Sequence, residues 1–310
     1  MNTPIKIQLK FEDFDQYAKL VEQGDLVYTQ LDGGFFKGAL TQVIHGPVII
    51  STHKMNRIIL QEGIGVKGFT TFLIPGNMEQ DFSWRKRRLR GNVLGILKSN
   101  MEHSCITKSN FYGTPVSVES KFLAEISNLL GYPNFISFIR DKETITIAIN
   151  IAERIHQLVD IYCKDIISDT SVITFELPKL IIKAISESDS VDKFKKESGR
   201  GIVFKKAQEI IHHNFEDPIS TISLCKEIGV SERNLRYAFK EYSGLSPKKY
   251  VRNYKLNKIR KLLHTDGVDK IIDAANQMGF WHTGQFAADY KRLFGELPSE
   301  TKTKNQRLIF

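Results

Sequence analysis

Short runs of apolar residues, separated by turn residues, occur over the first part of the chain. Residues 47–52, 68–74 and 92–97 are rich in β-branched and aromatic side chains, and glycine and proline residues separate the runs. Short runs between frequent turns are typical of the strands of a small barrel or sandwich. Residues 25–120 are therefore predicted to be β-rich.

The spacing of apolar residues changes to three and four after Pro115, which indicates amphipathic helices. Residues 117–131, 143–163 and 176–187 show this spacing, and their apolar faces need a partner, either the β-rich region or a second subunit. Residues 186–201 are polar and contain glycines, a composition typical of a linker. We expect a sensor and dimerisation domain over residues 1–195, a linker over 196–201 and a second domain over 202–305.

One pattern occurs twice in the second domain. The copies are 50 residues apart at their first two positions and 51 apart at the other four. Each copy is typical of a helix, a glycine-bearing turn and a second helix, which is the helix-turn-helix arrangement. The marker residues are Cys225, Gly229, Leu235, Phe239, Gly244 and Pro247 in the first copy, and Ala275, Gly279, Phe286, Tyr290, Gly295 and Pro298 in the second.

The second helix of the first copy, predicted over residues 232–242, has an apolar back formed by Leu235 and Phe239. Arginine pairs with guanine and asparagine with adenine in the major groove of DNA, so the opposite face suits base reading. Lysines at the start of the following helix, predicted over 247–263, are expected to reach phosphate, while a solvated face is the alternative for most lysines there. The candidate DNA contacts of this copy are Arg233, Asn234, Arg236, Tyr237, Lys240, Lys248 and Lys249.

The corresponding helix of the second copy, predicted over residues 283–294, has fewer long polar side chains. Its candidate DNA contacts are Thr283, Gln285, Ala288 and Lys291. Threonine and glutamine form hydrogen bonds with base edges, and alanine contacts the thymine methyl group. We expect this helix to discriminate between bases less strongly than the first. Two such helices on one domain would enter successive major grooves about 34 Å apart.

The charge of the chain is concentrated where the repeat lies. Residues 202–310 hold 19 Lys and Arg against 12 Asp and Glu, whereas the rest holds 25 against 23. This distribution favours double-stranded DNA as the partner of the second domain, with ordinary solubilising charge as the alternative. The three cysteines show no C-x-x-C spacing, and the histidines form no H-x-H motif. We therefore expect no metal, no cofactor and no enzymatic activity. The N-terminus lacks the apolar core of a signal peptide and no stretch has the length of a membrane span, so a cytoplasmic location without membrane contact is expected.

A basic run over residues 85–90 is the other sharp feature outside the second domain. Arg85, Arg87 and Arg90 are candidates for binding an anionic effector, because arginine suits phosphate. A solvated hairpin and an auxiliary contact to DNA or an acidic partner are the alternatives.

The repeat resembles the AraC/XylS family of bacterial transcription regulators. The family pattern is matched by Leu224-Cys225, Gly229-Val230-Ser231, Phe239-Lys240, Gly279-Phe280, Tyr290-Lys291 and Pro298-Ser299. The strings at 279–286, 30–38 and 82–85 resemble the subset that includes the ethanolamine operon regulator.

The resemblance implies an α+β protein, with a β-rich cupin-like N-terminal domain and an all-α C-terminal domain with two helix-turn-helix units. It also implies a small effector, dimerisation, and contact with RNA polymerase if the protein is an activator. The family's base-reading positions fall on Arg233, Arg236, Tyr237, Thr283, Gly284, Gln285 and Ala288. The rival hypothesis is a ligand-binding or interaction protein whose C-terminal domain no longer reads bases.

Overall fold

Contacts divide the chain into two compact units. The computed structural model describes residues 4–20, 26–77, 79, 81–85, 87–164, 172–188, 199–264 and 270–308. The main boundary falls between Phe194 and Lys195, and two upstream segments, Thr29–Phe36 and Arg57–Leu60, group with the second unit. Among the described helices, none combines the length and apolar character needed to cross a membrane.

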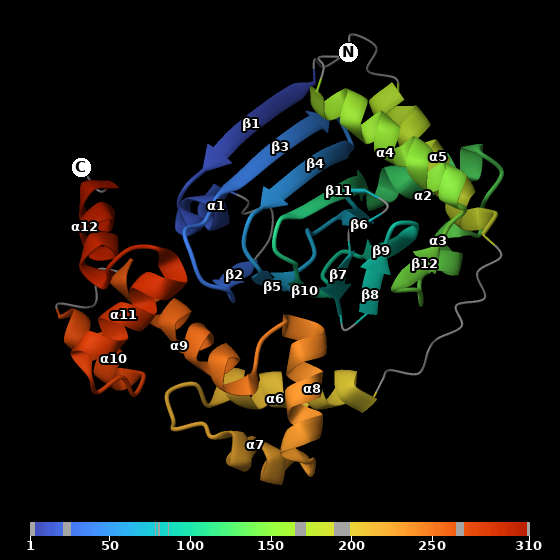
Figure 1. Ribbon diagram of the computed structural model, residues 1–310. Coiled ribbons are helices and arrows are strands. Elements are labelled where there is room, and N and C mark those ends of the chain that lie inside the picture. Colours follow the sequence, from blue (N-terminus) through green and yellow to red (C-terminus); the bar gives the residue numbers. More distant parts are fainter. Residues whose placement is uncertain are drawn as a thin grey trace. The chain divides into compact units, whose positions relative to one another are not determined.

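The strands of the chain form two β-sheets (Figure 1). The larger sheet is antiparallel throughout, in the order β1-β3-β4-β11-β6-β9-β12. The smaller sheet has the order β2-β5-β10-β7-β8. The strands are β1 (Ile5–Phe11), β2 (Val27–Gln30), β3 (Gly38–His45), β4 (Val48–Met55), β5 (Ile59–Ile64), β6 (Phe69–Pro75), β7 (Asp81–Trp84), β8 (Arg87–Arg90), β9 (Val93–Leu97), β10 (Glu102–Ile106), β11 (Phe111–Glu119) and β12 (Thr144–Thr146).

Helices cover one face of the larger sheet (Figure 1). Alternate strand residues such as Ile50, Phe72 and Val116 pack in one buried cluster with Ile155 and Ile181 of the helices. The β-rich region is thus a packing partner of the amphipathic helices. The helices of this unit are α1 (Phe14–Leu20), α2 (Ser120–Leu129), α3 (Phe135–Ile139), α4 (Ile149–Lys164) and α5 (Leu177–Ser186), with a π-helical turn at Val172–Glu176.

Two predicted helix starts were wrong because strand pairing extends further than the apolar spacing indicates. The helix predicted over 117–131 begins at Ser120, since Ser117 and Glu119 pair with β6. Pro115 lies inside β11 and does not end the strand region. The helix predicted over 143–163 begins at Ile149, since Thr144–Thr146 pairs with β9 as an edge strand.

The second unit contains the helices of the repeat, with bounds within a few residues of those predicted. Helix α6 begins at Gly199, so residues 199–201 of the expected linker are helical, while 196–198 lie outside the described residues. Phe239 packs between Phe204 and Tyr250, with ring centroids 5.0 and 5.2 Å away. The helices are α6 (Gly199–His213), α7 (Thr221–Ile228), α8 (Glu232–Ser243), α9 (Pro247–Leu263), α10 (Ile271–Gln277), α11 (Thr283–Phe294) and α12 (Pro298–Leu308).

Candidate nucleic-acid interface and ligand cavity

Helix α8 presents a polar face over a buried apolar back. Its start is fixed by Ser231, whose hydroxyl accepts a hydrogen bond from the Asn234 backbone N–H at 3.2 Å. Gly229 supplies the positive φ of 77° that ends α7 just before it. Leu235 and Phe239 are fully buried, as predicted. Arg233 and Arg236 are exposed, and Tyr237 is 45% exposed.

The ring of Tyr237 lies within reach of two guanidinium groups. Arg233 Cζ is 5.6 Å and Arg200 Cζ 5.2 Å from the centroid of the ring. Arg200 Nη1 also forms an ion pair with Glu241 at 3.1 Å. Such contacts restrict the rotamers of Tyr237 and Arg233 and so prepare this face for binding. Arg200 was missed by the sequence reasoning because it was assigned to the linker.

The other candidate contacts of the first helix-turn-helix unit differ in their surroundings. Asn234 is half-buried. Lys240 Nζ donates to the carbonyl of Gly244 at 3.3 Å, at the C-terminal end of its own helix. Lys248 and Lys249 are exposed in the first turn of α9, at the positive end of the helix dipole. These two lysines are therefore placed to meet phosphate.

Helix α11 repeats the arrangement with smaller side chains. Thr283, Gln285, Ala288 and Lys291 are exposed, as is Gly284, whereas Phe286 and Tyr290 are buried. Trp281 directly precedes the N-cap residue His282 and is 71% exposed. An exposed indole at the start of a candidate recognition helix is a further candidate for the interface.

Several basic residues of α9 hold the helices together. Lys255 is buried, and its Nζ donates to the carbonyls of Asp217 and Met278 at 3.0 and 3.2 Å. Arg260 is buried in an ion pair with Glu296 at 2.7 Å. The solvated face considered for these lysines and arginines does not apply to Lys255 or Arg260.

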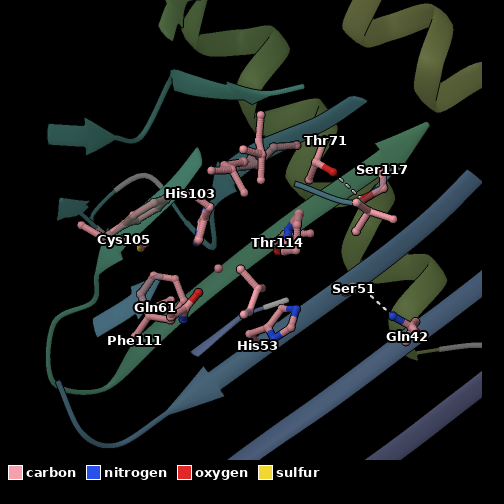
Figure 2. Close-up of a pocket in the computed structure, with 18 of the residues that line it drawn as sticks. Gln42, Ser51, His53, Gln61, Thr71, His103, Cys105, Phe111, Thr114 and Ser117 are labelled. Carbon is pink, nitrogen blue, oxygen red and sulfur yellow. Dashed lines mark hydrogen bonds between the residues drawn. The ribbon is translucent and has the colours of Figure 1, made fainter. Parts of the chain in front are cut away.

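A second candidate site is a cavity of about 120 Å³ in the first unit (Figure 2). It lies on the face of the larger sheet that alternates with the helix-packed face, because successive strand residues point to opposite sides. Figure 2 shows His53 of β4 and His103 of β10 on either side of this space. Other polar lining residues are Gln42, Ser51, Gln61, Thr71, Thr114 and Ser117.

His103 offers an unused hydrogen-bond donor at this cavity. The side chain is 6% exposed, and its Nδ1 accepts from Trp84 Nε1 at 3.3 Å. Nδ1 is therefore unprotonated, and a neutral ring carries its proton on Nε2. Nε2 has no hydrogen-bond partner among the described residues. Burial, with a smaller effect of Arg85, lowers the pKa of His103 to about 4, so the ring is neutral at pH 7.

The rest of the cavity lining is also uncharged. Burial lowers the pKa of His53 to about 4, and its Nδ1 lies 2.6 Å from the hydroxyl of Tyr17. The hydroxyls of Thr71 and Ser117 bond to each other at 2.8 Å, and Gln42 Nε2 donates to Ser51 at 3.1 Å. Sequence reasoning missed this site, although polar residues at alternating positions of buried strands were a signal for it.

In the basic run over residues 85–90, Arg87–Arg90 forms strand β8, which pairs with β7 in a hairpin that is not fully solvated. Arg85 lies in the turn, where its guanidinium pairs with Glu143 at 3.0 Å. Arg87 pairs with the same carboxylate at 3.0 Å. Arg90 is exposed, and Lys86 lies outside the described residues. Two of the three candidate arginines therefore already have an internal carboxylate partner.

Comparisons with known proteins agree on the repeat. A family described as "Helix-turn-helix domain" matches residues 224–304. The chain is 38% identical over 100 residues to XylDLEGF operon transcriptional activator 3 of Pseudomonas putida, covering 32% of this chain and 30% of that protein. It is 26% identical over 132 residues to the HTH-type transcriptional regulator ArgR of Pseudomonas aeruginosa, covering 42% of this chain and 39% of that one. The chain thus spans about a third of the length of the curated relatives it matches.

Solved structures give similar matches. A probable AraC family transcriptional regulator from Rhodopseudomonas palustris is 31% identical, with a TM-score of 0.32, covering 34% of this chain and 97% of that chain. The AraC-like transcriptional activator CuxR is 14% identical, with a TM-score of 0.44, covering 82% of this chain and 94% of that chain.

Proposed function

We propose a function for the whole protein on the premise that, through its C-terminal domain, the chain belongs to the AraC/XylS family of transcription regulators. The protein is a sequence-specific DNA-binding regulator. Its two recognition helices, α8 and α11, direct it to its DNA sequence. The observation that carries this proposal is the exposed trio Arg233, Arg236 and Tyr237 over the buried pair Leu235 and Phe239.

The two recognition helices divide the work of binding. Arg233 and Arg236 have the fork geometry that reads guanine O6 and N7, and Tyr237 and Asn234 add shorter polar contacts. In α11, Thr283 and Gln285 supply hydrogen bonds and Ala288 an apolar contact. Lys240, Lys248, Lys249 and Lys291 contact phosphate, which adds affinity without sequence preference.

The test is competition binding of the full chain at about 0.15 M salt, with a duplex recovered by in vitro selection and a random duplex. Arg233→Ala should cost about 1–3 kcal/mol on the selected duplex and relax preference at one base pair. Lys249→Ala should weaken both duplexes alike. If the wild-type chain shows no preference for any selected duplex, the C-terminal domain has lost base reading and the rival hypothesis holds.

The effector of this regulator binds in the cavity of the first unit and is a small uncharged molecule with a hydrogen-bond acceptor. A free volume of about 120 Å³ is close to the roughly 150 Å³ of cavities that hold benzene. Among the described residues that line it there is no charged side chain, and His103 Nε2–H is available as donor. An anion would lose its hydration without gaining a counter-charge. The cavity therefore supports an effector site better than Arg85, Arg87 and Arg90 do.

Pentanamide and pentanoate test this assignment, because they share a shape and differ in charge. Ligand-detected NMR with the full chain should show binding of pentanamide, weaker binding to His103→Phe, and no binding of pentanoate. If pentanoate binds more strongly than pentanamide, the assignment of an uncharged ligand is wrong, and Arg85, Arg87 and Arg90 become the better candidates for the effector site. Mass spectrometry of small molecules that copurify with the full chain addresses the natural effector.

The finer expectations belong to the same proposal. The relatives named as transcriptional activators support activation, and with it contact with RNA polymerase in the cytoplasm. The strings at 279–286 and 30–38 support the subset that includes the ethanolamine operon regulator. Assembly as a homodimer through the first unit is supported by exposed apolar side chains such as Leu129. Sedimentation of the full chain tests the dimer.

A further inference from the structure

Two short segments that lie far from the repeat in sequence are part of the DNA-binding unit. They are Thr29–Phe36, at the end of β2, and Arg57–Leu60, at the start of β5. We call them together the insert. The Leu31 backbone N–H donates to the carbonyl of Ile58 at 2.8 Å, and the Asp32 carboxylate accepts from the Ile58 backbone N–H at 2.6 Å. The two segments therefore form one connected element.

The insert is joined to α9 through the side-chain amide of Asn257. The backbone N–H of Gln30 donates to Asn257 Oδ1 at 2.9 Å, and Asn257 Nδ2 donates to the carbonyl of Gln30 at 2.8 Å. One side chain thus satisfies both backbone groups of a buried strand residue, as a neighbouring strand would. One turn earlier, Asn253 Nδ2 donates to the carbonyl of Leu31 at 2.5 Å. Both asparagines are buried, so losing these bonds leaves polar groups without water.

The same element is joined to the end of α11. Gln30 Nε2 donates to the carbonyl of Leu293 at 2.7 Å, and the Gly34 backbone N–H donates to the same oxygen at 3.0 Å. Leu293 lies in the last turn of α11, where carbonyls lack helical partners. The approach is close, because a Cβ on Gly33 would lie 2.7 Å from the carbonyl oxygen of Arg292. This explains the need for a glycine at position 33.

We propose that the insert is a positioning element of the DNA-binding unit. It fixes the end of α11 to α9, and it carries the state of the cavity to the second recognition helix. The route is along the chain, since the cavity-lining residues Tyr28 and Gln61 directly precede and follow the insert on β2 and β5. This inference rests on the proposed regulator function, and it makes Gln30 and Asn257 positioning residues without DNA contact.

Gln30→Met and Asn257→Leu test the first half in the full chain, with Gln16→Met, an exposed glutamine of α1, as the matched control. Both variants should raise the rate of backbone hydrogen exchange at Leu31 and Gly34. They should also lower the affinity for the selected duplex about tenfold, since each removes buried hydrogen bonds. Random-duplex affinity should change less than about twofold, because the phosphate contacts remain. The control should match wild type in both measurements. Rapid exchange of Leu31 and Gly34 in the wild-type chain, or unchanged affinity of both variants for the selected duplex, would overturn the proposal.

Val66→Phe tests the second half, since it narrows the cavity at a half-buried position outside the insert. It should alter hydrogen exchange of the insert and the affinity for the selected duplex, and Gln30→Met should abolish its effect on affinity. If Val66→Phe changes neither the hydrogen exchange of the insert nor the affinity for the selected duplex, the route from the cavity to the insert is refuted. Hydrogen exchange shows whether the bonds of the insert form in solution, even if the chain prefers no duplex. Failure of this inference can therefore be distinguished from failure of the proposed regulator function.

Discussion

Replacement of Lys255 distinguishes lysines that stabilise the fold from lysines that are proposed to contact DNA. Lys255 lies in the most basic helix of the chain, yet its ammonium group is bound to two carbonyls. Asp217 precedes α7 of the first helix-turn-helix unit, and Met278 ends α10 of the second. The ammonium group of Lys255 therefore joins the two helix-turn-helix units. Lys255→Met keeps the length of the side chain and removes its donors.

The expected cost follows from these two contacts. A hydrogen bond from a charged donor contributes about 1.5–3 kcal/mol. Burial lowers the pKa of Lys255, with Asp217 opposing the change, so part of this gain is offset by loss of hydration. Water can replace the partner of exposed Asp217 but not that of buried Met278. Lys255→Met should therefore lower the free energy of unfolding by about 2–3 kcal/mol.

Urea unfolding followed by ellipticity at 222 nm measures this cost, and DNA titrations at several salt concentrations measure phosphate contact. Lys249→Ala is the matched comparison. It should leave unfolding within about 0.5 kcal/mol of wild type and reduce the slope of log K against log salt by about 1. Lys255→Met should leave that slope unchanged and reduce preference for the selected duplex. A variant with normal stability and a reduced slope would show that Lys255 reaches phosphate and that this reasoning is wrong.

Three further outcomes are expected. As the pH falls from 6.5 to 4, protonation of His103 should lower the free energy of unfolding, by about 2 kcal/mol at pH 5, because the depressed pKa of His103 makes protonation favour the unfolded chain. The urea midpoints of His103→Gln should therefore vary less with pH than those of wild type. Arg260→Met should cost about 3–5 kcal/mol by leaving Glu296 charged and buried, and Arg260→Met with Glu296→Leu should recover part of it in a double-mutant cycle. Binding of the selected duplex should change the emission of exposed Trp281, since Trp84 is fully buried, and Trp281→Phe should abolish the change; unchanged emission at saturation would remove Trp281 from the interface.

The helix-turn-helix units were predictable because their signals are local. Ser220 accepts from the Ser223 backbone N–H at 2.9 Å and so caps α7, and Ser231 does the same for α8. The left-handed glycines at 229, 244 and 295 end helices where the repeat places them. Each of these choices involves only a few neighbouring residues, so spacing alone identifies them.

The first unit was harder to predict because its boundaries depend on distant partners. Ser117–Glu119 has helical spacing but pairs with β6, whose nearest residue is over 40 positions away in sequence. The cavity has the same origin, since Ser51, Thr71 and Ser117 become lining residues only when three strands are paired. Gln30 is a similar case, because its partner Asn257 is 227 residues away. Residue spacing can indicate such strands, but it does not identify which distant segments pair.

The charge of the C-terminal domain shows why composition predicts a partner class but not the individual contacts. Residues 202–310 hold 19 basic side chains, but Lys255 and Arg260 are buried, and Arg252 and Arg292 both pair with the buried carboxylate of Asp289. These groups stabilise the arrangement of α9 and α11, and the two buried cations, Lys255 and Arg260, are held by internal partners. The proposed direct contacts to phosphate therefore fall to exposed residues such as Lys248, whereas the buried cations fix the geometry that the proposed base reading requires. A domain of equal net charge without those internal pairs would bind DNA with similar strength but would not hold its two reading helices in register.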